Sequence, residues 1–557
     1  MKYRSWDTTR GREKGTHRAL YKSMGYSSDD LLKPMIGIAN AWSTVVPGHF
    51  NLRHVSKAVK EGIRQAGGTP VEFGVIGACD GISEGHEGKR YILPTRDLIA
   101  NDIEAMVEAH RFDGVVLLGS CDKIVPGMLM AAARLDIPAI LVNGGPALGG
   151  MVYGGKKCDV TALAEALGRY QMGEISEETL LEMEERVMPT CGSCSMLGTA
   201  NTMGCVAEAL GMMLPGAAVI PAVYAAREKI ALQSGEQIVR LVEKGITSRK
   251  IMTPGAIKNA IRLSSAIGGS TNVALHIPAI AYEVYMDFSI ALFDEISAQT
   301  PLLVKLNPAG PANVPDFFEA GGVQAVLKEM ETLLDGDALT VTGKTVTENL
   351  SEVARSRDND VIRGMDNPYS ESGGLAVLWG NLAPDGAVTK PAAIDPAMWT
   401  FQGRARVFNS ESETNQAIMD RKVQAGDVVV VRYEGPKGGP GMPEMFRAMK
   451  LLSGMGLAKK TALITDGRFS GTNSGCFVGH ISPEASEGGN LAVVKNGDTV
   501  IIDINKRKIH LEVSDEELKA RFQSWERPEP RIKSGYLRLY AQLARSASQG
   551  AVIPHRG

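Results

Sequence analysis

The first 150 residues alternate short apolar runs with longer stretches in which apolar positions recur every three or four residues. Short apolar runs favour buried strands, and the longer spacing favours helices with one buried face. The predicted strands lie at 34–40, 71–78, 114–119 and 139–142. The predicted helices lie at 52–65, 96–110 and 127–135. This alternation predicts an α/β fold with a doubly wound, mostly parallel sheet, and residues 150–345 are predicted to be mostly helical.

From Gly373 onward the pattern changes to short β-rich segments separated by Gly and Asn-Gly turns. These segments read GLAVLWG, GRARVF, DVVVVRY, TALITDG, NLAVVKNGDTVIIDI and RKIHLEV. They predict a compact β-barrel or sandwich. We therefore expect an N-terminal α/β domain over residues 1–368 and a C-terminal β-barrel-like domain over 369–557. The tail beyond Arg527 is predicted to end in a helix that docks on the body of the protein.

Chemically active residues follow three of the predicted N-terminal strands. In chain order they are Asn40, Cys79 with Asp80, and Cys121 with Asp122 and Lys123. The carboxyl ends of parallel strands meet at one edge of a sheet, where ligands bind. We therefore expect two cysteines, two acids and a lysine at the same edge. Carboxylate oxygens suit Mg²⁺, whereas an acid before a glycine is also an ordinary turn residue.

Charge and the chain's amino-terminal stretch limit the class of partner. The formal net charge is -3, which argues against a nucleic acid or an anionic membrane as the main partner. The N-terminal segment is polar and lacks the apolar core of a signal peptide. Residues 209–226 carry no charge, but prolines interrupt them, so we interpret them as a buried helix, turn and strand. The expected location is the cytoplasm, with no membrane partner.

Seven cysteines, an odd number, do not suggest a disulfide framework. Zinc usually needs two close ligand pairs, and the chain has a single CxxC, formed by Cys191 and Cys194. The segment does not resemble a thioredoxin-like unit. Two readings stay open: buried unreactive cysteines, or an iron–sulfur cluster with an incomplete set of protein ligands, whose open iron can bind substrate.

Gly-rich loops add further candidates. Glu444 lies in EGPKGGPGMPEM and Ser470 lies in TDGRFSGTNSG, where a serine could act as a base or merely cap the backbone. The GGSTN loop, with Ser270, Thr271 and Asn272, offers donors for an anion or ligand. His86 in EGHEG could contact substrate, although a lone histidine is more often structural.

Taken together, several long motifs resemble the dihydroxy-acid/phosphogluconate dehydratase family. They are KYRSWDTTRG, CDGISEGHEG, GSCDKIVPGMLMAAARL, CGSCSMLGTANTM, AEALGMMLPG, IGGSTNVALH, YEGPKGGPGMPEM and TDGRFSG with GHISPEA. The resemblance covers nearly the whole chain. It implies an N-terminal α/β domain, a C-terminal β-barrel, a homodimer and an active site between the two domains.

The resemblance also implies site residues, position by position. Cys121 and Cys194 match the family's cluster ligands, and Ser470 matches its proposed general base. The family's Mg²⁺ site matches Asp80, Asp122, Lys123 and Glu444, with the lysine carbamylated. Substrate contacts are expected at Ser270, Thr271, Asn272 and His86.

This chain departs from the family pattern at one position that is expected to bind the cluster. Members with a [2Fe–2S] cluster usually carry a third cysteine where this chain has Gly48. Cys79 is the nearest substitute, with Cys191 and Cys205 as fallbacks. The cluster is therefore either [2Fe–2S] with an unusual third ligand or [4Fe–4S], and we favour the latter.

The implied activity is that of a hydro-lyase, which dehydrates a 2,3-dihydroxy carboxylic acid to a 2-keto acid without electron transfer. The expected substrates are 2,3-dihydroxyisovalerate and 2,3-dihydroxy-3-methylvalerate of branched-chain amino-acid biosynthesis. A sugar-acid dehydratase acting on gluconate or xylonate is the alternative, because Glu84 and Lys89 stand where apolar residues are expected. A non-catalytic iron–sulfur protein is a remote third possibility.

Overall fold

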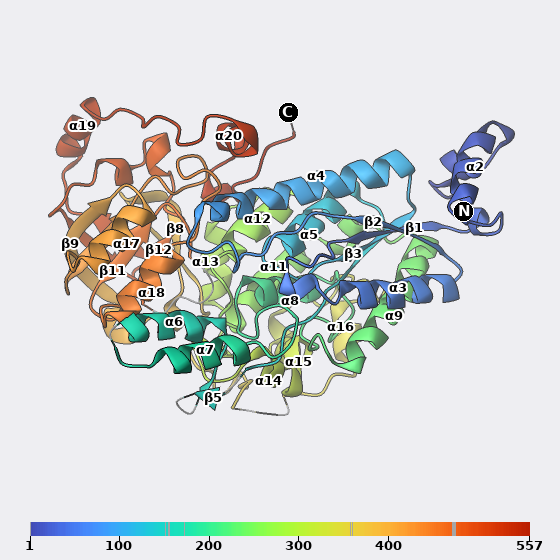
Figure 1. Ribbon diagram of the computed structural model, residues 1–557, viewed down its shortest axis with the longest axis horizontal. Helices are drawn as coiled ribbons and strands as arrows, with labels where there is room; N and C mark the ends of the chain where they lie inside the picture. Colours follow the sequence, from blue (N-terminus) through green and yellow to red (C-terminus); the bar gives the residue numbers. More distant parts are fainter. Residues whose placement is uncertain are drawn as a thin grey trace.

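The computed structural model describes residues 2–150, 152–153, 156–171, 173–356, 358, 360–469 and 475–556. It consists of a mixed helical and parallel-sheet part followed by a closed β-barrel (Figure 1). The α/β class, the parallel sheet and the C-terminal barrel are confirmed. Among the described residues, no helix combines the length and apolar character needed to cross a bilayer.

The N-terminal sheet has four parallel strands in the order β2-β1-β3-β4. β1 and β3 are buried along their whole length, which is typical of parallel strands covered on both faces. Figure 1 shows α4 above the sheet and α3 with α9 below it. The elements are β1 (Met35–Asn40), α3 (Leu52–Gln65), β2 (Thr69–Gly74), α4 (Ile92–His110), β3 (Gly114–Leu118), α5 (Ile124–Leu135), β4 (Ala139–Val142) and α9 (Ala225–Lys244).

One predicted strand has different limits. The strand expected at 71–78 is β2, which runs from Thr69 to Gly74. Its only neighbour is β1, and the last paired residues are Asn40 and Gly74. Because the partner strand ends there, residues 75–80 leave the sheet and carry Cys79 and Asp80 toward the site.

The middle of the chain is helical, as predicted. These helices are α6 (Val160–Gln171), α7 (Glu177–Arg186), α8 (Thr199–Ala209), α10 (Ser248–Ile251), α11 (Pro254–Ala266), α12 (Val273–Glu283), α13 (Ala291–Ala298), α14 (Val314–Glu319), α15 (Gly322–Glu329) and α16 (Val346–Leu350). After α8, the uncharged segment continues in turns up to α9, so the strand predicted within 209–226 is absent. β5 (Val152–Tyr153) pairs in an antiparallel manner with β6 (Lys156–Lys157).

Eight strands close the barrel in the order β10-β11-β12-β8-β7-β14-β13-β9. They are β7 (Ala376–Gly380), β8 (Ala383–Thr389), β9 (Thr400–Phe408), β10 (Asp427–Val431), β11 (Ala462–Thr465), β12 (Cys476–Gly479), β13 (Thr499–Asp503) and β14 (Lys508–Leu511). The expected strand at NLAVV is instead a 3₁₀ helix over Asn490–Val493.

Alternation along β10 explains how the barrel holds its helices. Val428 and Val430 point into the barrel core, whereas Val429 and Val431 pack with α18 (Phe446–Gly454) outside it. Other helices are α17 (Glu411–Met419) beside α18, and α19 (Asp515–Gln523) and α20 (Gly535–Leu543) in the tail. The Tyr536 hydroxyl of α20 donates to the Pro94 carbonyl of α4, 3.0 Å away, so the predicted docking helix is present.

Candidate active site

The site forms where loops from the sheet and the barrel meet. Cys79 and Asp80 follow β2, Cys121 and Asp122 follow β3, and Lys123 is the N-cap residue of α5. These loops leave the carboxyl ends of parallel strands, and β1 with β3 marks the point where the strand order reverses. From the barrel, the loop after β10 brings Glu444 and the loop after β11 brings Arg468.

Three carboxylates converge into a possible metal site. Asp80, Asp122 and Glu444 each offer an oxygen atom, and these atoms lie within 4.8 Å of one another. Among the described residues they are the one such group of metal-binding side chains. Two of them come from the N-terminal part and one from the barrel, so the structure assembles across both parts the three acids that the sequence separates.

Buried cations balance these acids. Lys123 Nζ lies 2.9 Å from Asp80 Oδ2 and 3.6 Å from Asp122 Oδ2. Lys89 Nζ contacts Asp80 Oδ1 and lies 3.1 Å from Glu444 Oε2. Both lysine side chains are almost fully buried. Burial makes an uncompensated charge costly, so each acid depends on such a partner.

The ionisation of the three acids differs because their neighbours differ. Burial opposes ionisation of Asp80, but Lys123 and Lys89 outweigh it and hold the pKa of Asp80 well below its usual value. Burial acts in the same way on Glu444, whose pKa Arg468 nevertheless lowers to about 2. Burial and the charge of Asp80 raise the pKa of Asp122 to about 7. Asp122 has the fewest cationic neighbours, and a divalent ion among the three acids would add the positive charge that it lacks.

Arg468 and Asn272 hold the carboxylate of Glu444 in position. Arg468 is fully buried, binds Glu444 Oε1 through Nη1 and donates from Nε to the Met442 carbonyl at 2.7 Å. Asn272 Nδ2 donates to Glu444 Oε1 at 3.2 Å and to the Phe469 carbonyl at 3.0 Å. Ser270 and Thr271 are also buried: the Ser270 hydroxyl lies 2.8 Å from the Thr199 hydroxyl. The GGSTN loop therefore supports Glu444 and the backbone before residue 470.

Three thiols face one cavity beside the acids. Cys79, Cys121 and Cys194 all line it, together with Asp80, Asp122 and Glu444. Burial, followed by the negative charges of neighbours that include Cys79 and Asp122, raises the pKa of the Cys121 thiol well above its usual value. Thiolates at this place therefore need a nearby metal charge. Cys191 does not line the cavity, and Cys205 packs in the hydrophobic core.

Gly48 lies where a further side chain would reach this cluster of thiols. It belongs to the 3₁₀ turn Pro47–His49 after β1 and lines the cavity. A Cβ atom on Gly48 would lie 2.7 Å from Cys121 Sγ and 3.2 Å from the Ser193 backbone nitrogen. The position is therefore adjacent to the thiols, and in this chain it supplies no ligand atom.

The cavity has a volume of about 410 Å³, and apolar side chains line it together with the acids. α6 supplies Val160, Leu163 and Leu167, and α18 supplies Phe446. Lys450 Nζ of α18 lies 2.9 Å from Glu165 Oε1 of α6, which joins the two helices across the two parts. A ligand here meets both charged groups and hydrocarbon.

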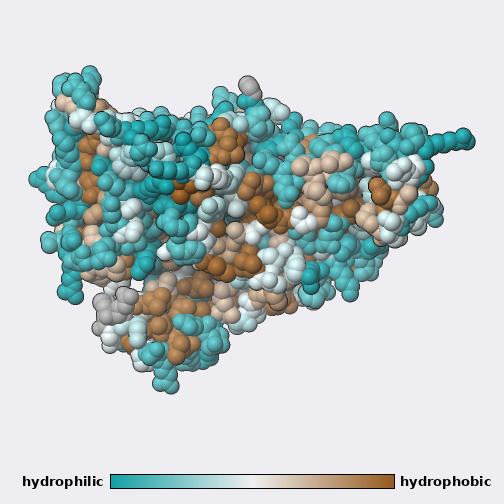
Figure 2. All heavy atoms as spheres, turned by 45° about the horizontal axis from the view of Figure 1, so that its top comes forward, coloured by the Kyte–Doolittle hydropathy of each residue, from teal (hydrophilic) through white to brown (hydrophobic). Residues whose placement is uncertain are grey.

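The apolar character continues to the surface. The face shown in Figure 2 is mostly hydrophilic, with hydrophobic patches on the lower lobe, where α6 and α7 lie in Figure 1. Leu167 and Tyr170 of α6 and Leu181 of α7 are exposed there. The cavity wall therefore merges with an apolar rim.

One predicted site residue, His86, is not brought to the cluster of acids and thiols, and the position of another, Ser470, is not described. His86 is exposed; its Nδ1 accepts from the Gly88 backbone nitrogen, and its Nε2 lies 3.0 Å from the Ile82 carbonyl, so it caps a 3₁₀ helix. Ser470 lies outside the described residues, directly after Phe469, whose carbonyl is bonded to Asn272.

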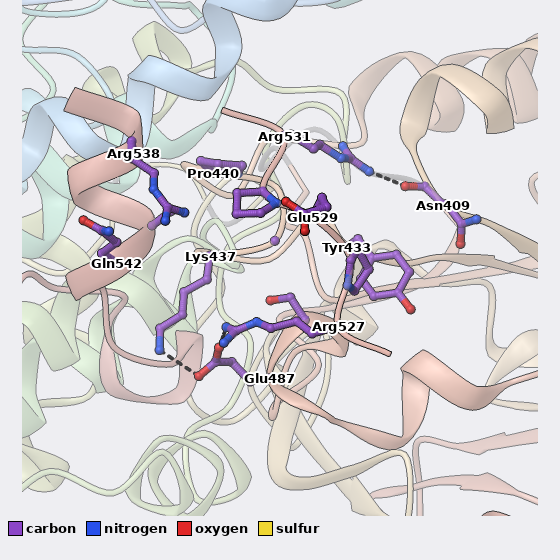
Figure 3. A pocket seen from close by; sticks show the side chains of 15 residues that line it. Asn409, Tyr433, Lys437, Pro440, Glu487, Arg527, Glu529, Arg531, Arg538 and Gln542 are labelled. Atoms are coloured by element: carbon purple, nitrogen blue, oxygen red, sulfur yellow. Dashed lines mark hydrogen bonds and ion pairs between the residues drawn. The ribbon is translucent and has the colours of Figure 1, made fainter. Parts of the chain in front are cut away.

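A second cavity, of about 630 Å³, lies beside the barrel and contains none of the predicted site residues (Figure 3). Several of its charged side chains already have partners: Lys437 Nζ lies 2.7 Å from Glu487 Oε2, Arg527 also contacts Glu487, and Arg531 binds the Asn409 carbonyl. The cavity shared by the acids and thiols is therefore the better candidate for chemistry.

Sequence reasoning missed Arg468 and the placement of Lys89. Arg468 lies inside the quoted motif TDGRFSG, next to the residues that were selected. A basic residue between two Gly-rich turns and close to a candidate base was the available signal. In the sequence, Lys89 was considered only for its effect on substrate choice, although in the structure its ammonium group contacts Asp80 and Glu444.

Comparison with known proteins agrees with this geometry. Residues 33–349 match the N-terminal domain, and residues 360–551 the C-terminal domain, of the dihydroxy-acid/6-phosphogluconate dehydratases. The chain belongs to this family, whose members are hydro-lyases, and the resemblance inferred from the motifs is confirmed.

Curated relatives are similar over their full length. Dihydroxy-acid dehydratase of Acetivibrio thermocellus is 52% identical over 555 residues, which is 99% of this chain and 100% of that protein. The enzyme of the same name from Caldanaerobacter subterraneus subsp. tengcongensis is 52% identical over 556 residues, covering 100% of both chains. That from Caldicellulosiruptor saccharolyticus is 52% identical over 546 residues, or 98% and 99%.

Proposed function

We propose that this protein dehydrates 2,3-dihydroxy carboxylic acids with an aliphatic side chain to 2-keto acids, in branched-chain amino-acid biosynthesis. The observation that carries the proposal is one cavity lined by three carboxylates, three thiols and several apolar side chains. The names of the full-length relatives support the same reaction. The non-catalytic alternative loses support because the acids converge as a metal-binding site does.

The wall of the cavity favours a branched aliphatic substrate. Val160, Leu163 and Phe446 offer no hydrogen bonds, and a polyol placed against them would leave its hydroxyl groups unpaired. Lys89, which raised the sugar-acid alternative, has its ammonium group turned into the acid cluster. The 2,3-dihydroxyisovalerate skeleton, with a carboxylate and a branched alkyl group, fits a cavity lined by both charged and apolar side chains.

The residues present fit two inorganic groups. Asp80, Asp122 and Glu444 have the hard oxygen atoms that Mg²⁺ requires, and carbamylation of Lys123 would add another. Cys121, Cys194 and Cys79 are proposed to hold an iron–sulfur cluster, with [4Fe–4S] favoured over [2Fe–2S]. Bound there, Mg²⁺ supplies Lewis acidity at the substrate carboxylate and C2 hydroxyl, and the cluster supplies it at the C3 hydroxyl.

The chain's own residues then move one proton and exclude water. Ser470, as an alkoxide, removes the C2 proton, the C3–oxygen bond breaks, and hydroxide leaves. The resulting enol tautomerises to the 2-keto acid. Asn272, with Arg468, keeps Glu444 in place during the reaction, and Ser270 and Thr271 are proposed to act through the same loop. His86 is not carried into this proposal, because its ring nitrogens are engaged with the backbone.

A substrate panel tests the proposed function. Protein purified without oxygen should be brown, contain iron and sulfide, and convert 2,3-dihydroxyisovalerate to a keto acid in the presence of Mg²⁺. Gluconate and xylonate should react at least about 10²-fold more slowly, because their hydroxyl groups lose hydrogen bonds against the apolar wall. Activity on gluconate or xylonate alone would transfer the assignment to a sugar-acid dehydratase. Colourless, fully active protein would refute the cluster.

Gly48→Ala is expected to lower the iron content. The added methyl group would approach Cys121 Sγ to 2.7 Å and displace this thiol. Iron and sulfide measured on anaerobic protein should fall several-fold. Gly74→Ala is the matched control, because a Cβ at Gly74 meets no atom within 4 Å. Full iron content in Gly48→Ala protein would show that the cluster does not use this end of the cavity.

The remaining proposals concern the domain boundary, the cellular location, the oligomeric state and the partners of the protein. We propose a division at residues 368/369, supported by the first barrel strand at Ala376. A cytoplasmic homodimer that binds a small-molecule dihydroxy acid and no nucleic acid is the expected form, supported by the near-neutral charge and the family.

A further inference from the structure

Lys89 occupies an unusual place for a lysine. It lies on the 3₁₀ helix Glu87–Tyr91, and only 3% of its surface is exposed. Its Nζ contacts Asp80 Oδ1 and Glu84 Oε1 and lies 3.1 Å from Glu444 Oε2. An ammonium group has three donors, and here each one has a carboxylate partner.

Two of these partners belong to the candidate metal site. Asp80 and Glu444 are two of the three acids whose oxygen atoms converge within 4.8 Å, whereas Glu84 is not a member of that group. A divalent ion among the three acids would draw on the same carboxylates as Lys89 and would repel the ammonium group. Metal and lysine therefore compete for Asp80 and Glu444.

Glu84 offers the ammonium group another position. Its Oε1 already contacts Lys89, while its Oε2 is buried and has no hydrogen-bond partner in the described structure. A buried carboxylate oxygen without a partner is costly, so it favours any arrangement that supplies a donor. Lys89 can keep its charge paired by giving Glu84 both contacts.

We propose that Lys89 is a positioning residue of the proposed magnesium site, an internal counter-cation that exchanges Asp80 and Glu444 for Glu84 when the metal binds. Before binding, its ammonium group holds the two acids together and prevents their mutual repulsion. After binding, Glu84 retains it. The inference rests on the proposed function, since it assumes that Asp80 and Glu444 bind a divalent ion. It makes the affinity for that ion depend on a lysine that never touches the ion.

The test is Mn²⁺ binding to full-length, cluster-loaded protein from which Mg²⁺ has been removed, followed by the electron paramagnetic resonance signal of free Mn²⁺. Lys89→Met removes the competing charge and should bind Mn²⁺ at least about tenfold more tightly. Glu84→Gln weakens the alternative partner and should bind at least about tenfold more weakly. In the double variant the Glu84→Gln effect should vanish, because no ammonium group remains to be moved.

Lys60→Met is the matched control. It removes a lysine whose partner, Glu72, lies outside the site, 2.7 Å from Lys60 Nζ, and it should leave Mn²⁺ affinity unchanged. A second measurement uses melting temperature: Lys89→Met should be less stable than the parent without metal and should gain more on addition of Mg²⁺.

The outcomes separate this inference from the proposed function. Unchanged or weaker Mn²⁺ binding by Lys89→Met overturns the inference, as do effects of the two substitutions that simply add. If Lys89→Met does not fold, parent-like Mn²⁺ affinity in Glu84→Gln overturns it by itself. If the parent protein fails to bind Mn²⁺, the proposed metal site is wrong.

Discussion

Replacement of Ser470 by alanine should lower turnover of 2,3-dihydroxyisovalerate at least about 10³-fold, within the usual range for the loss of a general base. The methyl group cannot accept the C2 proton, while the carboxylates and thiols that are proposed to hold the inorganic groups stay in place. Iron, sulfide and Mn²⁺ binding, measured on the same anaerobic preparation, should match those of the parent protein.

Ser453→Ala is a suitable control for this substitution. Ser453 lies near the C-terminal end of α18 and does not line the cavity. Turnover by the Ser453→Ala variant should equal that of the parent protein. Retained activity in Ser470→Ala would disprove the base assignment, and a parallel loss of iron would show that Ser470 maintains the site.

Glu444→Gln should abolish useful Mg²⁺ binding and turnover together. Removal of one negative charge beside a divalent ion weakens binding by at least about 10²-fold, equivalent to about 3 kcal/mol. Glutamine keeps a carbonyl oxygen that can accept from Asn272 and Arg468, so the loop should remain folded. Mn²⁺ titration and steady-state turnover measure the two losses.

Glu208→Gln provides the matched control. Glu208 is a buried carboxylate on α8 that accepts from the backbone nitrogens of Gly216 and Ala218, both outside the cavity. This substitution should leave Mn²⁺ affinity at the parent value. Normal Mn²⁺ binding by Glu444→Gln would remove Glu444 from the metal site and leave it as the partner of Arg468.

Local pattern predicted much of the fold. The helix Leu52–Gln65 and the strand Ala139–Val142 have the predicted limits, because their apolar spacing and the turns around them agree. Two barrel strands were not predicted. β8 contains Pro384, Asp385 and Gly386, which are typical of turns, and β12 has only four residues. Closure of the barrel, rather than local preference, makes these segments strands.

The sequence predicted part of the candidate site, and there is a physical reason why it did not predict the rest. The predicted topology alone placed Asp80 and Asp122 at the same edge of the sheet, because both follow parallel strands. The positions of Lys89 and Arg468 depend on pairing with Glu444, which is 355 residues from Lys89 and 24 residues from Arg468 in the sequence. No local pattern encodes such a pair. The supporting role of Asn272 likewise depends on how the barrel meets the N-terminal part.

The division of the acids between the two parts has a consequence for biosynthesis of the protein. A ribosome releases Asp80, Asp122 and the cysteines long before Glu444, and the docking segment around Tyr536 emerges later still. The nascent chain therefore carries thiols and carboxylates before Glu444 is present to complete the proposed metal site. We therefore expect insertion of the proposed iron–sulfur cluster and Mg²⁺ to be a late event, and a prematurely terminated chain should leave the ribosome without either.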